Sequence, residues 1–448
     1  MTTDDDSIVS ASADRGGGRH EIVRRANVQL VFQSIVDHAP VSRASLVALT
    51  NLSKPTVLRL VAALEQEGLI RRASPGPGVR RGAGRIPVVY EPNPDAAYVV
   101  GVDVGGTKLA AALADLAGNV RAEAEIPTPR SGAHDLLTEV AKLAKGLARS
   151  LDIPWSQVAS VTVGTPGVEN ADGTIRLADN VPGLGSVPLA AGLQTMLATP
   201  VQVENDVNLA ALGEMEEGAA QACDTFALLA LGTGLGAALV IDGHLARGSR
   251  GAAGEVAYLP IGADPASPEA RRRGAFEVAA AGSGLTALLA AELQGGTGST
   301  AGAGDLSAAS SARDIYDAAA RGDERARRAV GRQAELVAQA VLTIGCLIDP
   351  ELVVLGGGIG ANPLLQEMLG ESLDRIMPWR VPVELSALGA RSGVIGAIHH
   401  ARRSVPRLEA ANVSARMQSL SRDATPDAGS GHDDDDGDQG DQPGHDVN

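Results

Sequence analysis

Three glycine-rich segments of this 448-residue chain have the composition of loops that hold phosphate groups. The first, DVGGTK, covers residues 103–108 between two apolar runs, which predicts the turn of a β-hairpin. Its two glycines allow the main chain to approach a phosphate, while the threonine and the lysine add a hydroxyl and a positive charge. The aspartate before them could hold Mg²⁺ through water. The residues expected to face a nucleotide here are Asp103, Gly105, Gly106, Thr107 and Lys108.

The other two segments are LGTGLGA at 231–237 and LGGGIG at 355–360. A strand pattern rather than a helix follows LGTGLGA, which argues against a dinucleotide-binding Rossmann loop. Either segment alone fits a tight turn, but a nucleotide-binding cleft between two domains accounts for all three segments together. The cleft hypothesis adds five expected nucleotide-binding residues: Gly232, Thr233, Gly234, Gly357 and Gly358.

Acid–base chemistry is indicated by ENDVN at 204–208, where an apolar strand pattern gives way to a helical one. Ligands of α/β proteins bind at the carboxyl ends of strands, where Asn205 and Asp206 would be presented. Asp206 could act as the general base that deprotonates a sugar hydroxyl before phosphoryl transfer. The alternative is an aspartate that caps the N-terminus of the helix, a common structural role.

The elements that position these residues alternate between strand and helix patterns, which is typical of an α/β fold. Strand patterns begin at Tyr98, and an amphipathic helix is predicted over 133–151. The same alternation returns after residue 200, so we expect two lobes. The expected units are a disordered segment (1–20), a head (21–90), a body (91–404) with a first lobe (about 96–200 plus the C-terminal helix) and a second lobe (about 201–385), and a disordered acidic tail (405–448).

The head has the pattern of three short helices followed by two strands. Ser42 can cap the second helix and Ser53 the third, which is expected to stop at Gly68. The third helix places cations on its outer face near its start, the part of a recognition helix that reaches base edges. The pattern predicts a winged helix-turn-helix that binds DNA, and the alternative is an unrelated small helical bundle. The expected DNA-binding residues of the third helix are Lys54, Thr56 and Arg59.

The stretch SPGPGVRRGAGRIP lies between two predicted strands, Leu69–Arg72 and Ile86–Tyr90. Arginines on a flexible backbone suit a narrow, A·T-rich minor groove, so the stretch is interpreted as a DNA-binding wing. The alternative is a solvated linker. The arginines concerned are Arg80, Arg81 and Arg85.

Charge is spread unevenly along the chain, whose formal net charge is −16. Residues 15–85 carry 12 Lys and Arg against 4 Asp and Glu, and the rest of the chain is acidic. A basic head on an acidic body is typical of a regulator that touches DNA at one end.

Cys223 and Cys346 are too few for a Cys-rich zinc site. No apolar run of about 18 residues predicts a membrane span, and we expect a cytoplasmic protein.

Taken in order, the motifs of the chain resemble those of the ROK family (repressors, open reading frames and sugar kinases). The resemblance covers residues 27–400 and implies a two-lobed, actin-like ATPase fold of the ribonuclease H-like class, with ATP and Mg²⁺ as cofactors. It also implies a sugar site lined by Asn205, Asp206, Glu255 and Glu277, with Asp206 as catalytic base if kinase activity is retained. The motifs are DVGGTK (103–108), VGTPGV (163–168), NVPGL (180–184), ENDVN (204–208), LGTGLGA (231–237), GAAGEVAY (251–258) and LGGGIG (355–360).

One departure from the family pattern concerns zinc. Family kinases bind one zinc ion through a histidine and three cysteines, and this ion shapes the loop that carries the sugar-binding glutamate. Here Tyr258 stands at the position of the histidine, and Pro268, Ala270 and Ala275 stand at those of the cysteines. We therefore expect no zinc and impaired phosphorylation of sugars. Sugar binding is still expected, because Glu277 is kept and Tyr258 could offer its hydroxyl to a ligand.

We interpret the chain as a sugar-responsive transcriptional regulator, a repressor of carbohydrate metabolism or uptake genes. A sugar or sugar phosphate would bind the cleft, close the two lobes and change the placement of the DNA-binding heads. The main alternative is an active, glucokinase-like sugar kinase with an added DNA-binding head; a third is a bifunctional protein in which slow phosphorylation resets the sensor. The expected partners are a double-stranded DNA operator and a further copy of the chain, as a homodimer or homotetramer, with no membrane.

Overall fold

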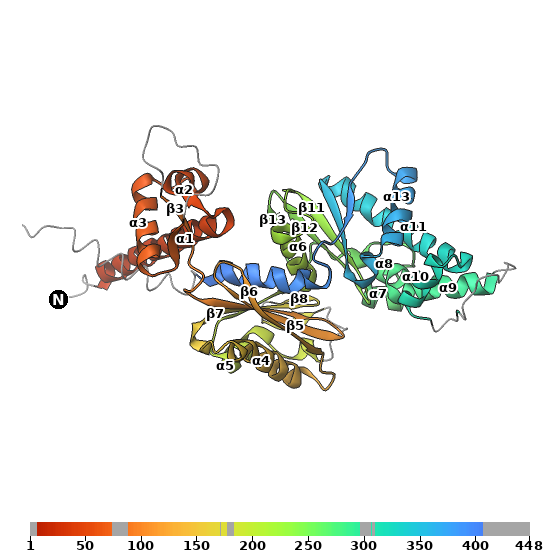
Figure 1. The fold of residues 1–448 in the computed structure, drawn as a ribbon, viewed down its shortest axis with the longest axis horizontal. Helices are drawn as coiled ribbons and strands as arrows, with labels where there is room; N and C mark the ends of the chain where they lie inside the picture. The colour runs from red at the N-terminus through yellow and green to blue at the C-terminus, as the bar shows by residue number, and fades with distance from the viewer. Residues whose placement is uncertain are drawn as a thin grey trace, which may run out of the picture.

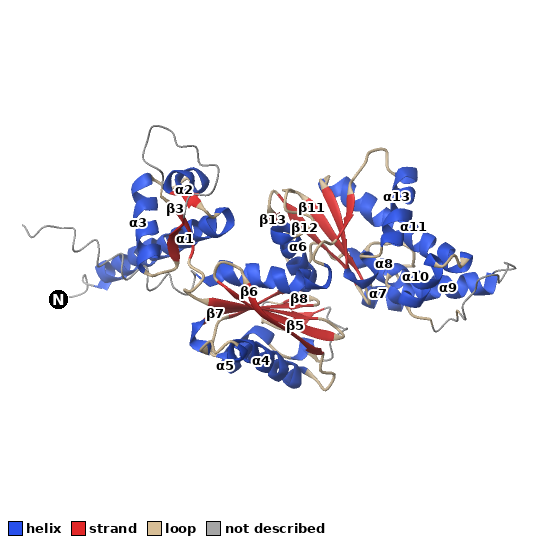
Figure 2. Ribbon diagram, viewed as in Figure 1, coloured by secondary structure: helices blue, strands red, loops and turns tan. Residues whose placement is uncertain are grey.

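The computed structural model describes residues 7–73, 88–170, 172–176, 183–295, 306 and 310–405. Figure 1 shows three units: a head, a first lobe and a second lobe, with the chain returning at its end to cross the first lobe. Helices cover both faces of the central sheet in each lobe (Figure 2).

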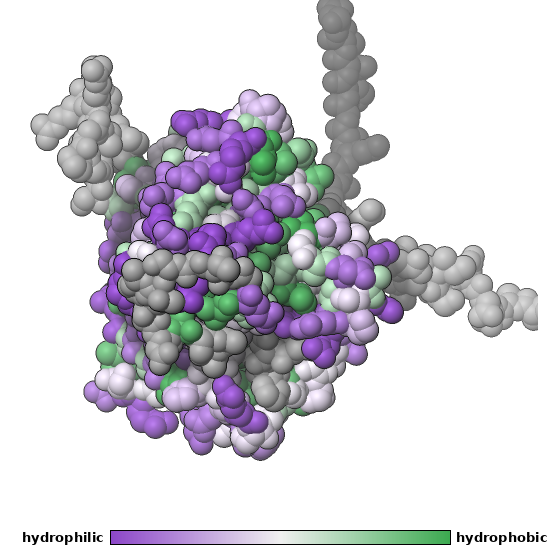
Figure 3. Space-filling model, turned by 90° about the vertical axis from the view of Figure 1, so that its right-hand side faces the viewer, coloured by the Kyte–Doolittle hydropathy of each residue, from purple (hydrophilic) through white to green (hydrophobic). Residues whose placement is uncertain are grey.

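No helix among the described residues has the length and apolar character needed to cross a membrane. On the end of lobe 2 that faces away from the head, hydrophilic residues are abundant and hydrophobic ones gather in separate patches (Figure 3).

The described part of the head contains three helices and a small antiparallel sheet with the strand order β1-β3-β2. The second and third helices begin where serines cap them: Ser42 Oγ accepts from Ser45 N at 3.1 Å, and Ser53 Oγ accepts from Thr56 N at 3.3 Å. Both caps were predicted from the sequence. The elements are α1 (Ser7–His38), β1 (Val41–Ser42), α2 (Arg43–Thr50), α3 (Lys54–Gln66), β2 (Ile70–Ala73) and β3 (Val89–Pro92).

Two features of the head differ from the expectation. Helix α1 begins at Ser7, within the segment 1–20 that was expected to be disordered. Helix formation is cooperative, and no proline lies between residues 7 and 38, so the packed end around Phe32 can extend backwards. Strands β2 and β3 begin one and three residues later than predicted. Residues 74–87 between them lie outside the described residues, and they include Arg80, Arg81 and Arg85.

The first lobe is built on a sheet with the strand order β10-β7-β4-β5-β6. Helices α4 and α5 pack on one face, and a helix over residues 392–405 covers the other (Figure 1). The elements are β4 (Tyr98–Val104), β5 (Lys108–Asp115), β6 (Val120–Pro127), α4 (Ala133–Ser150), η1 (Trp155–Gln157), β7 (Val158–Thr165), β8 (Val168–Glu169), β9 (Ile175–Arg176), η2 (Leu184–Ser186), α5 (Leu189–Leu197) and β10 (Val201–Asn205).

The second lobe is built on a sheet with the strand order β13-β12-β11-β14-β15. Helix α6 packs on one face, and α9, α11 and α13 share a core with the other. The elements are α6 (Asp206–Glu217), β11 (Phe226–Leu231), β12 (Leu235–Ile241), β13 (His244–Leu245), η3 (Val256–Tyr258), α7 (Pro268–Arg273), α8 (Ala275–Ala280), α9 (Gly282–Gly295), α10 (Ala312–Ala320), α11 (Glu324–Ile348), β14 (Leu352–Gly356), α12 (Gly357–Gly360), α13 (Pro363–Ile376), β15 (Val383–Leu385) and η4 (Gly389–Arg391).

Both sheets follow the same topology. In each, the first three strands in chain order pair in antiparallel. The fourth strand pairs in parallel with the first, and the fifth pairs in parallel with the fourth. The strand pairing corrects the expected boundary between the two lobes. Val201–Asn205, assigned from the sequence to the second lobe, pairs in parallel with β7 and is the edge strand of the first lobe. The chain therefore crosses between the lobes at Asn205 and Asp206, the residues expected to bind a sugar.

The lobes are also joined where α6 crosses the helix over 392–405. A Cβ on Gly396 would lie 1.7 Å from the Leu209 carbonyl oxygen, and one on Gly213 would lie 2.3 Å from the Ser392 carbonyl oxygen. Glycine at both positions therefore allows main chain to touch main chain. Next to this crossing, the buried Glu214 carboxylate accepts hydrogen bonds from the amides of Ala387 and Leu388, each at 3.1 Å. These bonds fix the chain segment that leads into the crossing helix.

Candidate ligand-binding cleft

A cleft of about 810 Å³ lies between the two lobes, at the end of both sheets where the glycine-rich turns occur. Of the residues expected to bind a nucleotide, six line this cleft: Gly106, Thr107, Gly232, Thr233, Gly234 and Gly357. The other four, Asp103, Gly105, Lys108 and Gly358, lie outside its lining. All five residues expected to bind a sugar line the same cleft: Asn205, Asp206, Glu255, Tyr258 and Glu277.

The crossing point between the lobes places Asp206 in the cleft. The preceding Asn205 is the N-cap of α6, because its Oδ1 accepts from Val207 N and Asn208 N at 3.0 Å each. Asp206 is therefore the first helical residue and not the cap that the alternative interpretation proposed, although its Oδ1 also accepts from Val207 N at 2.9 Å. Protein atoms replace much of its hydration, and this burial raises the pKa of Asp206 to about 6.

Asp103 lies near the end of β4, beneath the first glycine turn. Burial, with a smaller contribution from the negative charge of Asp206, raises the pKa of Asp103 to about 7, and Lys108 opposes the shift. The Lys108 ammonium donates to Glu125 Oε1 at 2.6 Å across the β5–β6 pair. Both side chains of this ion pair are exposed and lie outside the lining of the cleft, so the nucleotide-binding role of Lys108 stays a prediction.

The glycine turns leave room for a phosphate-bearing group. A Cβ on Gly357 would lie 2.3 Å from the Leu231 carbonyl oxygen, and its φ of +78° favours glycine. By contrast, a Cβ on Gly232 would have the Gly358 amide nitrogen as its nearest neighbour, at 3.9 Å. Open space therefore lies between these two turns, and the hydroxyl-bearing Thr107 and Thr233 line the same cleft. Glycine turns that leave main chain accessible, together with two hydroxyls, fit the phosphates of a nucleotide.

Three further side chains approach the cleft from the second lobe. Burial raises the pKa of Glu255, with Arg176 opposing the shift and Glu277 adding to it. The Tyr258 hydroxyl donates to the Arg272 carbonyl oxygen at 3.0 Å, so its hydrogen is used within the protein. Glu277 Oε2 accepts from Leu235 N, at the start of β12, at 3.1 Å. Together with Asp206, the side chains of Glu255 and Glu277 provide carboxylate acceptors suited to the hydroxyls of a sugar.

Three arginines that the sequence patterns did not indicate also line the cleft: Arg130, Arg272 and Arg273. Arg130 follows β6, whereas the other two end helix α7. A signal for Arg273 was present, because Glu269, Arg273 and Glu277 are spaced four residues apart, the spacing of side chains that meet on a helix. For Arg130 the sequence offers no comparable spacing.

The outer surface of the head carries the expected residues of α3. Lys54 and Arg59 are exposed, and Arg59 Nε donates to the Pro55 carbonyl oxygen at 3.4 Å. Thr56 is half-buried and its hydroxyl is 2.8 Å from Ser53 Oγ, so it belongs to the cap of the helix. The hydrophobic core of the head continues into the helix over 392–405, which holds the head against the first lobe.

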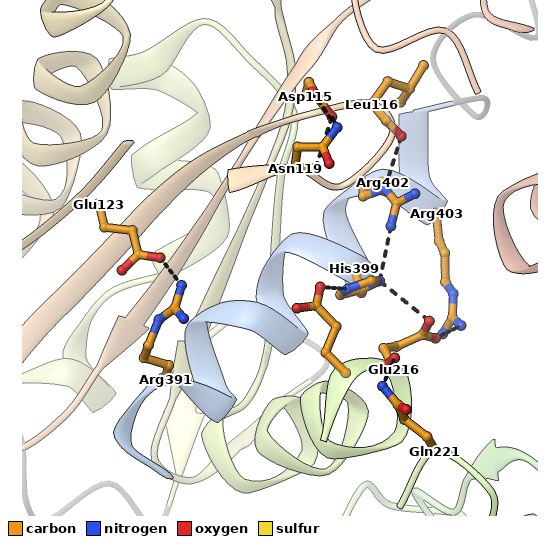
Figure 4. Close-up of polar contacts among 11 residues, drawn as sticks. Asp115, Leu116, Asn119, Glu123, Glu216, Gln221, Arg391, His399, Arg402 and Arg403 are labelled. Atoms are coloured by element: carbon orange, nitrogen blue, oxygen red, sulfur yellow. Dashed lines mark hydrogen bonds and ion pairs between the residues drawn. The ribbon is translucent and has the colours of Figure 1, made fainter. Parts of the chain in front are cut away.

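Polar side chains of the helix over 392–405 contact α6 (Figure 4), and one of them also contacts the head. Arg403, on the helix over 392–405, contacts Asp37 of α1 at 3.4 Å and forms an ion pair with Glu216 of α6. One turn earlier, His399 Nε2 lies 2.8 Å from Glu217 Oε1, and this hydrogen bond lowers the pKa of Glu217. Because α6 also begins with Asp206, a single helix extends from the cleft to these contacts.

Comparisons with known proteins identify relatives of this arrangement. The ROK family pattern matches residues 99–404. The xylose repressor of Caldicellulosiruptor bescii is 27% identical over 391 residues, which are 85% of this chain and 96% of the repressor. The structure of a ROK family glucokinase from Streptomyces griseus in complex with glucose and AMPPNP is 28% identical and covers 68% of this chain and 100% of that chain, with a TM-score of 0.58.

A solved ROK family transcriptional regulator, a homologue of the E. coli MLC protein, covers 89% of this chain and 99% of its own. Its TM-score is 0.67 at 21% identity, a likeness of fold that extends beyond the two lobes. The family pattern spans both lobes and includes every residue that lines the cleft. The chain belongs to the ROK family.

Proposed function

We propose that the chain is a sugar-responsive, DNA-binding transcriptional regulator that represses genes of carbohydrate metabolism or uptake. The elements of the head occur in the order of a winged helix-turn-helix, with capped helices. One strand, β2, precedes the segment interpreted as the wing, and another, β3, follows it. Lys54 and Arg59 lie exposed on α3, the helix that would enter the major groove. The likeness to a xylose repressor, which extends over 85% of this chain, supports this assignment of the head.

The observation that carries the proposal is the course of α6. The helix begins at Asp206 in the cleft and ends at Glu217, beside Glu216, which pairs with Arg403. Arg403 in turn contacts Asp37 on α1 of the head. A ligand that binds the closed lobes better than the open ones would shift the lobes, and this rigid helix would carry the shift to the head. A kinase has no need for such a connection.

DNA binding is tested by titrating the full chain onto DNA from upstream of its own gene, at several salt concentrations. Arg59→Ala should weaken binding by about 1–3 kcal/mol and reduce its salt dependence if Arg59 contacts the duplex. Arg380→Ala, which removes an exposed arginine of the second lobe, is the matched control and should change neither. Unchanged binding by Arg59→Ala would remove the recognition role of α3.

Coupling is tested by repeating the titration with xylose, glucose, N-acetylglucosamine and their phosphates. Arg403→Ala should keep the affinity for the sugar but lose most of the change in DNA affinity that the sugar causes. Lys142→Ala is the control, because it removes an exposed ion pair to Glu139 that lies within α4 of the first lobe. A variant without Arg403 that still responds fully would show that the signal takes another route.

An active, ATP-dependent sugar kinase is the second candidate function. A pKa of about 6 for Asp206 suits a general base near neutral pH. The glucokinase likeness supports the use of ATP, for which Thr107, Thr233 and the glycine turns would hold the phosphates. The zinc-binding residues expected of family kinases are replaced by Tyr258, Pro268, Ala270 and Ala275, and we therefore favour the regulator.

A further inference from the structure

Arg273 is the last residue of α7, and its guanidinium contacts side chains on three elements. Nε donates to Glu277 Oε1 of α8 at 3.0 Å, and Nη1 lies 3.3 Å from Glu269 Oε1 of α7. Nη2 donates to Ser283 Oγ of α9 at 3.1 Å. The arginine side chain is 23% exposed and the Glu277 side chain 14% exposed, so this pair is better shielded from water than a surface ion pair.

The Glu277 carboxylate is held at both oxygens. Oε1 accepts from Arg273, and Oε2 accepts from the main-chain amide of Leu235, which follows the glycine turn of the second lobe. The backbone between the two helices is also fixed, because Gly274 has a φ of +95° and a Cβ there would lie 2.2 Å from the Ala257 carbonyl oxygen. Glu277 therefore has its orientation set before any ligand enters the cleft.

We propose that Arg273 is a positioning residue that determines the affinity of the cleft for its sugar by orienting Glu277. The inference rests on the proposed sugar-binding function. A carboxylate that already has a cation partner and a fixed orientation accepts a hydroxyl hydrogen bond without a further loss of side-chain freedom. The guanidinium is suited to this role, because its planar set of donors can bind three acceptors at fixed angles.

The inference defines what the ligand must supply. Arg273 neutralises Glu277, and the remaining acceptor sites of that carboxylate point to hydroxyl donors rather than to a cation. Asp206 lines the same cleft and also accepts. The chemical class is therefore a polyhydroxylated ligand that donates hydroxyls to Asp206 and to Glu277 at the same time.

The test measures binding of neutral sugars by calorimetry to the full chain and to its variants, starting from whichever sugar the unmodified chain binds. Arg273→Ala should weaken binding by about 10–100-fold, the range found when a partner that orients a metal-binding side chain is removed. Arg273→Lys should restore part of the lost affinity, because lysine keeps the positive charge but lacks the planar set of N–H donors. Arg271→Ala, on the same helix but outside the cleft lining, should bind normally.

A double-mutant cycle separates positioning from a general effect on folding. If Arg273 acts through Glu277, Arg273→Ala in the background of Glu277→Gln should cause little further loss of affinity. Additive losses, or affinity in Arg273→Ala within about twofold of the unmodified chain, would overturn the inference. Thermal unfolding without sugar monitors the structural role, for which Glu269→Ala, which breaks only the neighbouring ion pair, is the reference.

The two proposals fail in distinguishable ways. If the unmodified chain binds none of the neutral sugars or sugar phosphates, the proposed function fails and with it the premise of this inference. If the chain binds a sugar and Arg273→Ala binds it equally well, sugar binding stands and the positioning role of Arg273 is wrong.

Discussion

The two lobes share one sheet topology, and they differ at the hairpin that each presents to the cleft. In the first lobe, Asp103 stands next to the end of β4, opposite Ala110. In the second lobe the corresponding position, next to the end of β11, is Ala230, opposite Gly236. The first hairpin thus adds a carboxylate to a glycine turn, whereas the second presents main chain, a threonine hydroxyl and no acid.

Two sheets of the same topology can therefore carry different chemical groups. The second lobe obtains its acidic groups from outside the shared sheet, since Glu255 precedes η3 and Glu277 lies in α8. Asp206 belongs to neither hairpin and lies where the chain crosses between the lobes. Ligand selectivity is therefore expected to depend on the crossing and the added helices, and phosphate binding on the shared turns.

The largest expected effect is at Asp206, where the chain passes from the first lobe to the second. Asp206→Ala should weaken sugar binding by about 100-fold or more, because hydrogen bonds to a charged acceptor contribute about 1.5–3 kcal/mol each. The thermal stability should not fall, because burial of this carboxylate opposes its ionisation. Calorimetry with the preferred sugar measures the loss. A coupled ADP-release assay sharpens the comparison: turnover above about 1 s⁻¹ that disappears in Asp206→Ala would favour the kinase.

Next in size is the effect of filling the third glycine turn, which follows β14. Gly357→Ala should destabilise the fold by about 2–3 kcal/mol, because its backbone has a positive φ and its Cβ would overlap Leu231. Gly358→Ala is the control, since a Cβ there meets nothing within 4 Å. Chemical denaturation of both variants provides the comparison. Equal stabilities would mean that the turn after β14 relaxes around the added methyl group.

The smallest expected effect is a pH dependence of the first hairpin. The pKa of Asp103 is about 7 in the fold against an ordinary value of 3.8. Between these values the folded state holds the proton more tightly than the unfolded chain, so this group's contribution to stability decreases as pH rises through that window. Asp103→Asn removes the ionisation and should raise the free energy of unfolding by about 1–3 kcal/mol at pH 8.

At pH 4 the same variant should differ little from the unmodified chain, because Asp103 is then largely protonated in the fold. Unfolding measured at both pH values gives the difference directly. A stability gain of the same size at pH 4 and at pH 8 would contradict the raised pKa and would leave the two hairpins electrostatically alike.

Local patterns predicted most of the fold. The serine caps of α2 and α3 and the hairpin at 103–108 depend on residues close in sequence, and all are present. The boundary between the lobes was wrong because it depends on the pairing of β10 with β7, which lies about forty residues earlier in the chain. Distant pairing of this kind leaves no local signal.

The carboxylates of the site were predictable because their motifs are short and occur in family order. The cations were not. Lys108 pairs with Glu125 because the β5–β6 register places them diagonally on adjacent strands, and the register is set by the whole ladder. Arg273 was overlooked because Gly274 interrupts the helical pattern, although the four-residue spacing of Glu269, Arg273 and Glu277 survives that break.

The glycine crossing has a mechanical consequence for α6. Gly213 is a point about which the helix would pivot, because its main chain touches the neighbouring helix there with no side chain in between. At the rise of an α-helix, Asp206 lies about 10 Å to one side of this point and Glu217 about 6 Å to the other. A rotation of the helix about this point would therefore move Asp206 further than it moves Glu217 at the base of the head.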